Sequence, residues 1–288
     1  MQLISGKLIA SKIEAGLVQG GSMQKVLAIV RANADSASAK YVELKIAKAN
    51  KLGISTKLIE FPDTTTKDEV TAAINKLNLD PTVTGVLVQL PLFPNLEGFR
   101  GEILNTIAPE KDVDGLTAVN QGRLQLGESA FVPATVGAVI ESLRFSQWPD
   151  DYDFGGHEAE FANWLKGKNV VVINHSALIG RPLADILLNY GCTVSVCHEF
   201  TQNLKALTTQ ADIVVTATGK TQLFDHNFFK TGAVLVDCTS VTTPHGPTGD
   251  IILSPELEAK VAWLTPVPGG IGPVTIAYLL RNFAAGVN

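Results

Sequence analysis

The chain has 288 residues, of which 45% are hydrophobic and 18% are charged. This composition supports a large apolar core and excludes an intrinsically disordered protein. Lys and Arg number 23 against 28 Asp and Glu, and the net charge of −5 disfavours a binder of nucleic acid or of anionic membranes. Two domains of ordinary size account for the length.

The sequence predicts neither export nor membrane insertion. Its apolar runs are far shorter than the roughly 20 residues of a membrane span, and its first residues lack the pattern of a secretory leader. Cys192, Cys197 and Cys238 have no metal-ligand spacing and indicate a reducing compartment. We therefore expect a cytoplasmic enzyme or binding protein with no metal and with neither membrane nor nucleic acid as partner.

The first part of the chain alternates two patterns. Short apolar runs have the length of buried strands, and apolar residues at three- and four-residue spacing between them indicate helices. The order strand, helix, strand, helix, strand predicts a parallel sheet with covered faces. The expected strands are Val26–Val30, Lys57–Phe61 and Gly85–Leu90, and the expected helices are Ser36–Leu52 and Thr64–Leu77.

A helix is expected over residues 133–145, followed by a segment of low periodicity, Ser146–Lys166. We interpret this segment as a surface excursion between domains with a short helix around Glu158–Leu165. A second alternation then begins at Val170, and Pro182 suits the first turn of a helix. Its expected strands are Val170–Ile173, Thr193–Cys197, Ile213–Thr216, Val234–Asp237 and Ala262–Leu264, and Val274–Phe283 is the expected last helix.

Three groups of residues in the first part can carry chemistry. Tyr41 and Lys45 share a helical face, and a partly desolvated lysine beside a phenol can shuttle protons, although a solvated lysine fits the pattern too. Gln89 ends a buried strand, where ligands bind in parallel sheets, or it merely ends the strand. Asp112 and Asp114 precede a glycine and either present carboxylate oxygens to a ligand or form a plain turn.

Nucleotide-binding features appear in the second part. Asn174–Pro182 links a strand to a helix, where free N–H groups favour a phosphate, but it lacks the G-x-G-x-x-G pattern. Glu199 follows the next strand, at the usual place of an acid that binds the adenosine ribose. The Ala217–Gly219 turn allows a close approach of backbone to a cofactor. The stiff loop Pro266–Pro273, with three glycines and three prolines, is expected to shape a site.

These motifs together resemble one family. YVELK, GVLVQLPL, PEKDVDGL, IGRP and TPVPGGIGPVT occur in the order and spacing of the methylenetetrahydrofolate dehydrogenase/methenyltetrahydrofolate cyclohydrolase family, and the resemblance covers residues 1–285. It implies an α/β protein with a parallel folate-binding catalytic domain (residues 1–132 and 268–288) and a Rossmann-like dinucleotide-binding domain (133–267). The last helix would pack back on the first domain.

The resemblance also implies roles for individual residues. Lys45 would be the acid/base of the cyclohydrolase step, Tyr41 would orient the folate, Gln89 would hold Lys45, and Asp114 would bind the pterin ring. The implied substrate-binding residues are Tyr41, Val88, Gln89, Leu90, Asp114, Pro268, Gly269 and Gly270. The implied cofactor-binding residues are Asn174, His175, Ser176, Gly180, Arg181, Pro182, Glu199, Thr218, Gly219 and Ser240.

The implied chemistry belongs to one-carbon metabolism. A hydride passes from 5,10-methylenetetrahydrofolate to a nicotinamide cofactor, and water then converts the methenyl product to 10-formyltetrahydrofolate. A homodimer is also implied. Because the folate-side motifs are intact and the nucleotide side has drifted, two alternatives stay open: a cyclohydrolase with weak or lost dehydrogenase activity, and a non-catalytic folate- or nucleotide-binding regulator.

For the dinucleotide, the residues and the family resemblance lead to different predictions. The family default is NADP. A carboxylate at Glu199 accepts hydrogen bonds from a ribose 2′-OH but repels a 2′-phosphate by a few kcal/mol at an effective dielectric of about 20. Arg181, directly after Gly180, is expected to face the pyrophosphate or solvent. The sequence therefore predicts that NAD is used at least as well as NADP.

Overall fold

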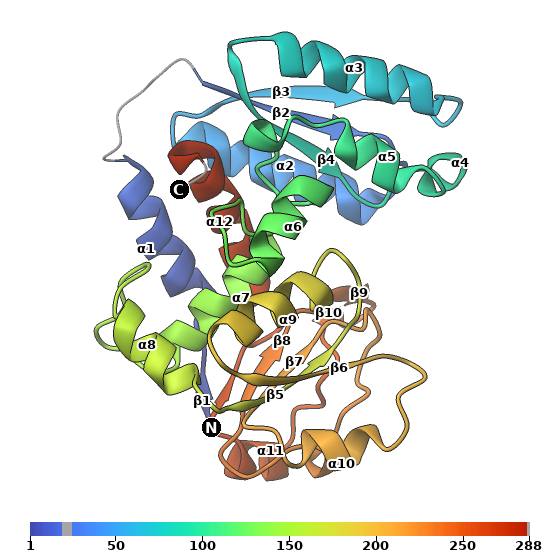
Figure 1. Cartoon of the computed structure of the whole chain (residues 1–288). Coiled ribbons are helices and arrows are strands. Elements are labelled where there is room, and N and C mark those ends of the chain that lie inside the picture. The colour runs from blue at the N-terminus through green and yellow to red at the C-terminus, as the bar shows by residue number, and fades with distance from the viewer. Residues whose placement is uncertain (19–24, 287–288) are drawn as a thin grey trace. The chain divides into compact units, whose positions relative to one another are not determined.

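The computed structural model describes residues 1–18 and 25–286 (Figure 1). The chain divides into two compact units: unit 1 comprises Met1–Ile13 and Ala134–Tyr278, and unit 2 comprises Glu14–Pro133 and Leu279–Asn288. Two helices, α1 (Gly6–Val18) and α12 (Ile271–Ala285), each contribute to both units. Within the described residues, no helix is long and apolar enough to cross a bilayer.

Unit 2 contains a three-stranded parallel sheet in the order β3-β2-β4. Alternate residues of a strand point to opposite faces, so Ala28 and Val30 of β2 pack with Val70 and Ile74 of α3 on one face. Figure 1 shows α2 on the other side of the sheet. The elements of this unit are β2 (Val26–Arg31), α2 (Ser36–Lys51), β3 (Ser55–Glu60), α3 (Lys67–Leu79), β4 (Val83–Gln89), α4 (Pro94–Glu97), α5 (Arg100–Asn105), the 3₁₀ helix η1 (Pro109–Lys111) and α6 (Ala118–Gln125).

Local sequence explains where these helices start. Asp35 caps α2 by accepting a hydrogen bond from the N–H of Ser38 at 2.6 Å. Thr66 and Glu69 form a reciprocal capping box at the start of α3, so the helix begins after the threonines that the sequence placed at its start. The expected strands and helices of this unit all form, with ends displaced by three residues at most.

Unit 1 is built on a six-stranded parallel sheet in the order β1-β11-β8-β7-β5-β6. The sequence predicts no strand at β1, which pairs with β11 through Gln2↔Trp263. The strands are β1 (Gln2–Leu3), β5 (Asn169–Ile173), β6 (Thr193–Cys197), β7 (Ile213–Thr216), β8 (Val234–Asp237) and β11 (Trp263–Leu264), with a separate hairpin of β9 (Val241–Thr243) and β10 (Gly246–Thr248).

Helices surround this sheet and complete the unit. They are α7 (Ala134–Phe145), α8 (Glu158–Leu165), α9 (Gly180–Asn189), α10 (Leu204–Thr208), α11 (Pro255–Lys260) and the 3₁₀ helix η2 (His226–Phe228). The short helix expected at Glu158–Leu165 is confirmed as α8. The last helix starts at Ile271, three residues earlier than expected, because the loop's final Gly-Pro fits the first turn of a helix.

The excursion at 146–166 is not only a surface feature. Tyr152 is buried, and its hydroxyl donates a 2.7 Å hydrogen bond to the carboxylate of Glu141 on α7. Arg144, also buried, donates to the carbonyl oxygen of Gly156 at 2.6 Å and pairs with Glu158 at 2.7 Å. The excursion therefore folds onto α7, and these long-range contacts have no signal in its irregular sequence.

Candidate active site

Lys45 lies on α2, and its ammonium group is buried. The residue is only 7% exposed, and its Nζ donates a 2.9 Å hydrogen bond to Oε1 of Gln89 at the end of β4. Burial lowers the pKa of Lys45, and the negative charge of Asp114 opposes part of that effect. Lys45 therefore releases its proton at a lower pH than a solvated lysine, and the alternative of a solvated side chain does not apply.

Gln89 is held so that its carbonyl oxygen faces Lys45. Its Nε2 donates a 2.8 Å hydrogen bond to the carbonyl oxygen of Leu90. Asn33, which follows β2, donates to the carbonyl oxygen of Pro91 at 2.7 Å and lies 3.4 Å from the carbonyl oxygen of Gln89. Asn33 thus ties together the carboxyl ends of neighbouring strands. Sequence reasoning missed this residue, whose only signal is its place just after a strand.

Tyr41 lies one turn before Lys45, with its ring centroid 5.9 Å from the lysine Nζ. Burial raises the pKa of its phenol, so the hydroxyl keeps its proton and can donate a hydrogen bond. Lys48, on the same helix, pairs with Glu14 at 2.8 Å. Lys45 is therefore a base with a lowered pKa, and Tyr41 offers a protonated phenol and an aromatic surface beside it.

The two aspartates of the turn after η1 differ in environment. Asp112 is buried, and burial raises its pKa. Its carboxylate accepts hydrogen bonds from Leu116 N at 3.1 Å, Thr117 N at 2.8 Å and Asn120 Nδ2 at 2.9 Å. Asp112 therefore closes the turn, whereas the half-buried Asp114 is the carboxylate whose charge reaches Lys45.

The structure thus brings Tyr41, Lys45 and Gln89 together and places Asp114 within electrostatic reach. Gln89 ends β4, and the order β3-β2-β4 makes the carboxyl ends of β2 and β4 a switch point, where ligands bind in open parallel sheets. A buried lysine, an aromatic ring and a carboxylate at such an edge can bind a polar heterocycle and move a proton on it. Val88 is packed in the core and Leu90 is half-buried.

In unit 1, Asn174 closes the turn between β5 and α9. Its Oδ1 accepts hydrogen bonds from the N–H groups of Ser176 at 2.9 Å and Gly180 at 3.0 Å. Its Nδ2 donates to the carbonyl oxygen of Ala217 at 2.8 Å. The expectation that these N–H groups are free for a phosphate is therefore wrong, because the turn's own asparagine already accepts from them.

The other nucleotide-side residues follow β5, β6, β7 or β8 in the chain. Pro182 sits in the first turn of α9 as expected, and Arg181 is exposed. Because β5 and β6 are paired, the exposed His175 and His198 that follow them have ring centroids 5.1 Å apart. Glu199 is exposed beside this histidine pair. Thr218, Gly219 and Ser240 follow β7 and β8.

The loop before α12 is held by close backbone packing. A Cβ at Gly6, in the first turn of α1, would overlap the carbonyl oxygen of Gly270, and one at Gly270 would press on Pro266. The loop also contains the cis peptide Val267–Pro268. Gly6 has no counterpart in the sequence analysis, since its need for a small side chain arises only from this tertiary approach.

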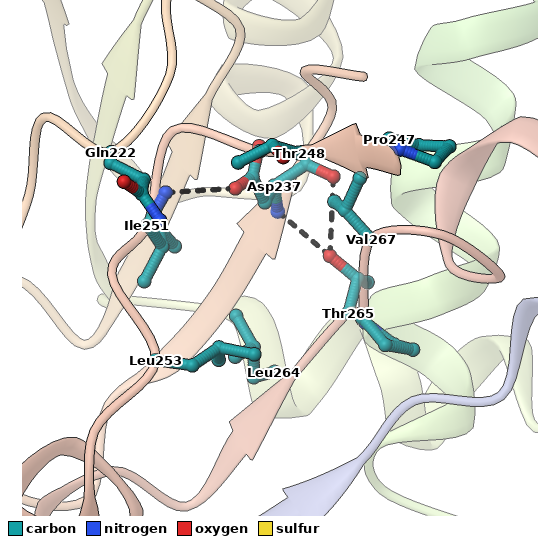
Figure 2. A pocket seen from close by; sticks show the side chains of 11 residues that line it. Gln222, Asp237, Pro247, Thr248, Ile251, Leu253, Leu264, Thr265 and Val267 are labelled. Carbon is teal, nitrogen blue, oxygen red and sulfur yellow. Dashed lines mark hydrogen bonds between the residues drawn. The ribbon is translucent and has the colours of Figure 1, made fainter. Parts of the chain in front are cut away.

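A pocket of about 230 Å³ lies at the carboxyl end of β8 (Figure 2). Asp237, the last residue of β8, lines it together with Gln222, Thr248 and Thr265. The sequence predicts Asp237 only as the last residue of a strand, and nothing in it singles out the buried Asp250. An aspartate that ends an otherwise apolar strand is the one local signal available.

Two family models match the chain. Residues 4–114 match the catalytic domain of tetrahydrofolate dehydrogenase/cyclohydrolase, and residues 159–288 match its NAD(P)-binding domain. The bifunctional protein FolD of Methanosarcina barkeri is 39% identical, and the alignment covers 98% of this chain and 94% of the relative.

Solved structures agree with these matches. The bifunctional FolD methylenetetrahydrofolate dehydrogenase/cyclohydrolase of Campylobacter jejuni superposes with a TM-score of 0.88 at 35% identity, covering 99% of this chain and 98% of that one. The FolD enzyme of Trypanosoma brucei, solved with NADP and an inhibitor, gives a TM-score of 0.86 at 30% identity over 98% and 95% of the two chains.

Proposed function

Because the chain belongs to the tetrahydrofolate dehydrogenase/cyclohydrolase family, we propose that it oxidises 5,10-methylenetetrahydrofolate with a nicotinamide dinucleotide and hydrolyses the methenyl product to 10-formyltetrahydrofolate. The observation that carries the hydrolytic half is the buried Lys45 bonded to Gln89. A nicotinamide dinucleotide held at the turns after β5 and β7 would supply the hydride acceptor of the oxidative half. A methenyl cation is electrophilic enough to react with water once a group manages the protons.

Lys45 is the proposed acid/base. In its neutral form it takes a proton from the water that attacks the methenyl carbon. It then returns that proton to N5 as the N5–C bond breaks. The remaining hydroxyl proton leaves to solvent as the carbon–oxygen double bond forms, so the formyl group stays on N10 and one proton is released overall. The lowered pKa of Lys45 makes the neutral form accessible, and the carbonyl oxygen of Gln89 keeps the ammonium oriented between the two transfers.

The neighbouring side chains hold the folate in this proposal. The protonated phenol and ring of Tyr41 stack on or orient it, and the carboxylate of Asp114 accepts hydrogen bonds from the pterin N–H groups. Pro268, Gly269 and Gly270 are further proposed folate contacts. Asp114 is the proposed ligand-binding carboxylate because its charge reaches Lys45, whereas Asp112 accepts hydrogen bonds from the N–H groups of its own turn.

The dinucleotide is assigned to the switch point of unit 1, at the carboxyl ends of β5 and β7. The turns Asn174–Pro182 and Thr218–Gly219 lie there, and Ser240 follows β8. The exposed Glu199 disfavours a 2′-phosphate by charge repulsion, so we propose that NAD serves at least as well as NADP.

One observation favours a second candidate, a cyclohydrolase with weak dehydrogenase activity. The Asn174 side chain accepts hydrogen bonds from two N–H groups of the turn that is proposed to bind the phosphate. Asn174→Gly frees these two N–H groups. If the Asn174 side chain competes with the phosphate for them, the variant is expected to bind the dinucleotide more tightly, as measured by calorimetry. Unchanged or weaker binding would show that Asn174 does not compete with the cofactor.

A homodimer and a cytoplasmic location also remain proposals. Support for the homodimer comes from β6, the outer strand of its sheet, whose Val196 is 39% exposed; a second copy can cover such an edge. Light scattering of the purified protein tests it, and a monomer mass at micromolar concentration would contradict the dimer.

Mixing the protein with methylenetetrahydrofolate and either dinucleotide tests the main proposal. Absorbance of the methenyl intermediate and of the reduced cofactor is followed with time. Both activities predict reduced cofactor without lasting methenyl accumulation. Hydrolysis of added methenyltetrahydrofolate without cofactor reduction would indicate the cyclohydrolase alone, and neither reaction would indicate a non-catalytic binder.

A further inference from the structure

Two buried carboxyl groups in unit 1 have no part in the proposed chemistry. Asp237 is 3% exposed and Asp250 is fully buried. Asp250 accepts hydrogen bonds from the hydroxyl of Thr216 at the end of β7, and from the N–H (2.9 Å) and hydroxyl (2.8 Å) of Thr218. Its carboxylate therefore bonds to both residues that flank Ala217.

Asp237 organises the next strand end in a similar way. Its carboxylate accepts from the N–H groups of Thr239 and Ile251, both at 3.0 Å. Figure 2 shows Asp237 between Ile251 and Thr265, whose hydroxyl accepts from the Asp237 N–H at 2.7 Å. The loop that contains Asp250 is thereby tied to the end of β8.

The hydroxyl of Thr239 connects the contacts of Asp237 with the turn that Asp250 holds. The N–H of Gly219 donates a 3.1 Å hydrogen bond to Oγ1 of Thr239, the residue whose own N–H is held by Asp237. Gly219 has a φ of +70°, a left-handed conformation that glycine adopts without strain and that most other residues disfavour. From the opposite side, Asn174 donates to the carbonyl oxygen of Ala217. The turn after β7 is thus fixed at successive residues.

We propose that Asp250, Asp237 and Thr239 are positioning residues that set the Ala217–Gly219 turn for the dinucleotide. This inference rests on the proposed dehydrogenase function, which places the dinucleotide at the ends of β5 and β7. The three residues act through the turn and do not touch the reacting atoms. A turn that is already ordered loses less conformational freedom when the dinucleotide binds, so affinity is higher.

The charge state of the pair fits this role. Burial, together with the negative charge of Asp250, raises the pKa of Asp237 to about 7. The thiol of Cys238 is the other titratable group beside the pair, and burial raises its pKa. Asp237 therefore keeps its proton into the neutral range, which avoids two adjacent buried charges while its oxygens still accept from Thr239 and Ile251.

Thr239→Val tests the inference because it removes one hydroxyl with little change in shape. Loss of an acceptor for the Gly219 N–H predicts about a three- to tenfold higher Kd for NAD and NADP. Thr239→Ser keeps the hydroxyl and is expected to bind like the wild type. Asp250→Ala is expected to raise the Kd for the dinucleotides more than Thr239→Val does. If Asp250→Ala does not fold, the result for Thr239→Val decides the inference.

Glu141→Gln is the matched control, since it alters another buried carboxyl of unit 1 that is bonded to Tyr152. It is expected to lower the melting temperature without changing either Kd. Hydrogen exchange of residues 216–219 without ligand is expected to quicken in Thr239→Val only. Hydrolysis of methenyltetrahydrofolate, which needs no dinucleotide, is expected to stay at the wild-type rate in Thr239→Val.

Two results would overturn the inference and can be told apart. A folded Thr239→Val protein with wild-type Kd and exchange would show that the turn does not depend on this contact, while the dehydrogenase proposal would stand. A wild-type protein that binds neither dinucleotide would refute the dehydrogenase proposal itself, and the inference with it.

Discussion

Lys45 gives the sharpest test of the proposed hydrolytic step, because its neighbour Gln89 can be altered separately. Lys45→Met keeps the length of the side chain and removes the ammonium. A positioned acid/base contributes about 10²–10⁴ in rate, so hydrolysis of methenyltetrahydrofolate is expected to fall by at least 100-fold. Oxidation of methylenetetrahydrofolate is expected to fall less, because the hydride passes directly to the cofactor.

Gln89→Leu tests the charge state that the structure assigns to Lys45. The 2.9 Å hydrogen bond from Nζ to Oε1 favours the ammonium form. Hydrogen bonds to charged groups contribute about 1.5–3 kcal/mol, and one pKa unit corresponds to about 1.4 kcal/mol. Removing the bond is therefore expected to lower the pKa of Lys45 further.

The assay is the pH profile of methenyl hydrolysis, with dinucleotide absent, in the wild type and both variants. The limb that reports deprotonation of Lys45 is expected to move to lower pH in Gln89→Leu and to vanish in Lys45→Met. Circular dichroism checks that each variant is folded. Near-normal hydrolysis by folded Lys45→Met protein would refute the acid/base assignment, and an unmoved limb in Gln89→Leu would refute the contribution of the hydrogen bond.

Three further predictions concern other parts of the molecule. Asp114→Asn exchanges an acceptor oxygen for a donor, so folate affinity by calorimetry is expected to fall about ten- to a hundredfold with dinucleotide binding unchanged; equal affinity would contradict the pterin contact. Glu199→Ser is expected to raise kcat/KM with NADP relative to NAD, and a wild type that already prefers NADP tenfold or more would contradict the repulsion argument. Asp237 has a folded pKa of about 7 against an ordinary 3.8, so the folded state holds its proton longer than the unfolded state. Its contribution to stability is therefore lost as pH rises through this interval. The free energy of unfolding of the wild type is expected to fall relative to that of Asp237→Asn by about 1.4 kcal/mol per pH unit between pH 5 and 7. Parallel pH dependences of the two unfolding free energies would exclude the raised pKa of Asp237.

Much of the candidate site was predictable because its signals are local. Tyr41 and Lys45 share a helical face through their spacing alone. The structure bonds Lys45 to Gln89, as the family resemblance implies, and places the Tyr41 ring 5.9 Å from the lysine Nζ. The roles of these residues stay predictions. The resemblance supplied the pairing of Lys45 with Gln89, since nothing in the local sequence relates residues on a helix and a later strand.

The nucleotide side shows where local reasoning stops. A strand followed by a turn and a helix predicted free N–H groups for a phosphate, but Asn174 accepts from two of them and reaches across to Ala217. The sequence shows that residue 174 is an asparagine, but it does not show which groups the side chain bonds to. Likewise, Asp237 and Asp250 become a pair only when the loop that contains Asp250 folds back to the end of β8.

The sequence by itself determined the parallel α/β class, most strands of the two parallel sheets and the longer helices of unit 2, because hydrophobic periodicity and caps such as Thr66 with Glu69 act within a few residues. It also carried the family motifs in their order. Only the tertiary structure decided that Gln2 pairs with Trp263, that Lys45 is buried, and that Gly6 must lack a side chain. Such pairings depend on which distant segments become neighbours, and desolvation and steric fit exist only once those neighbours are in place.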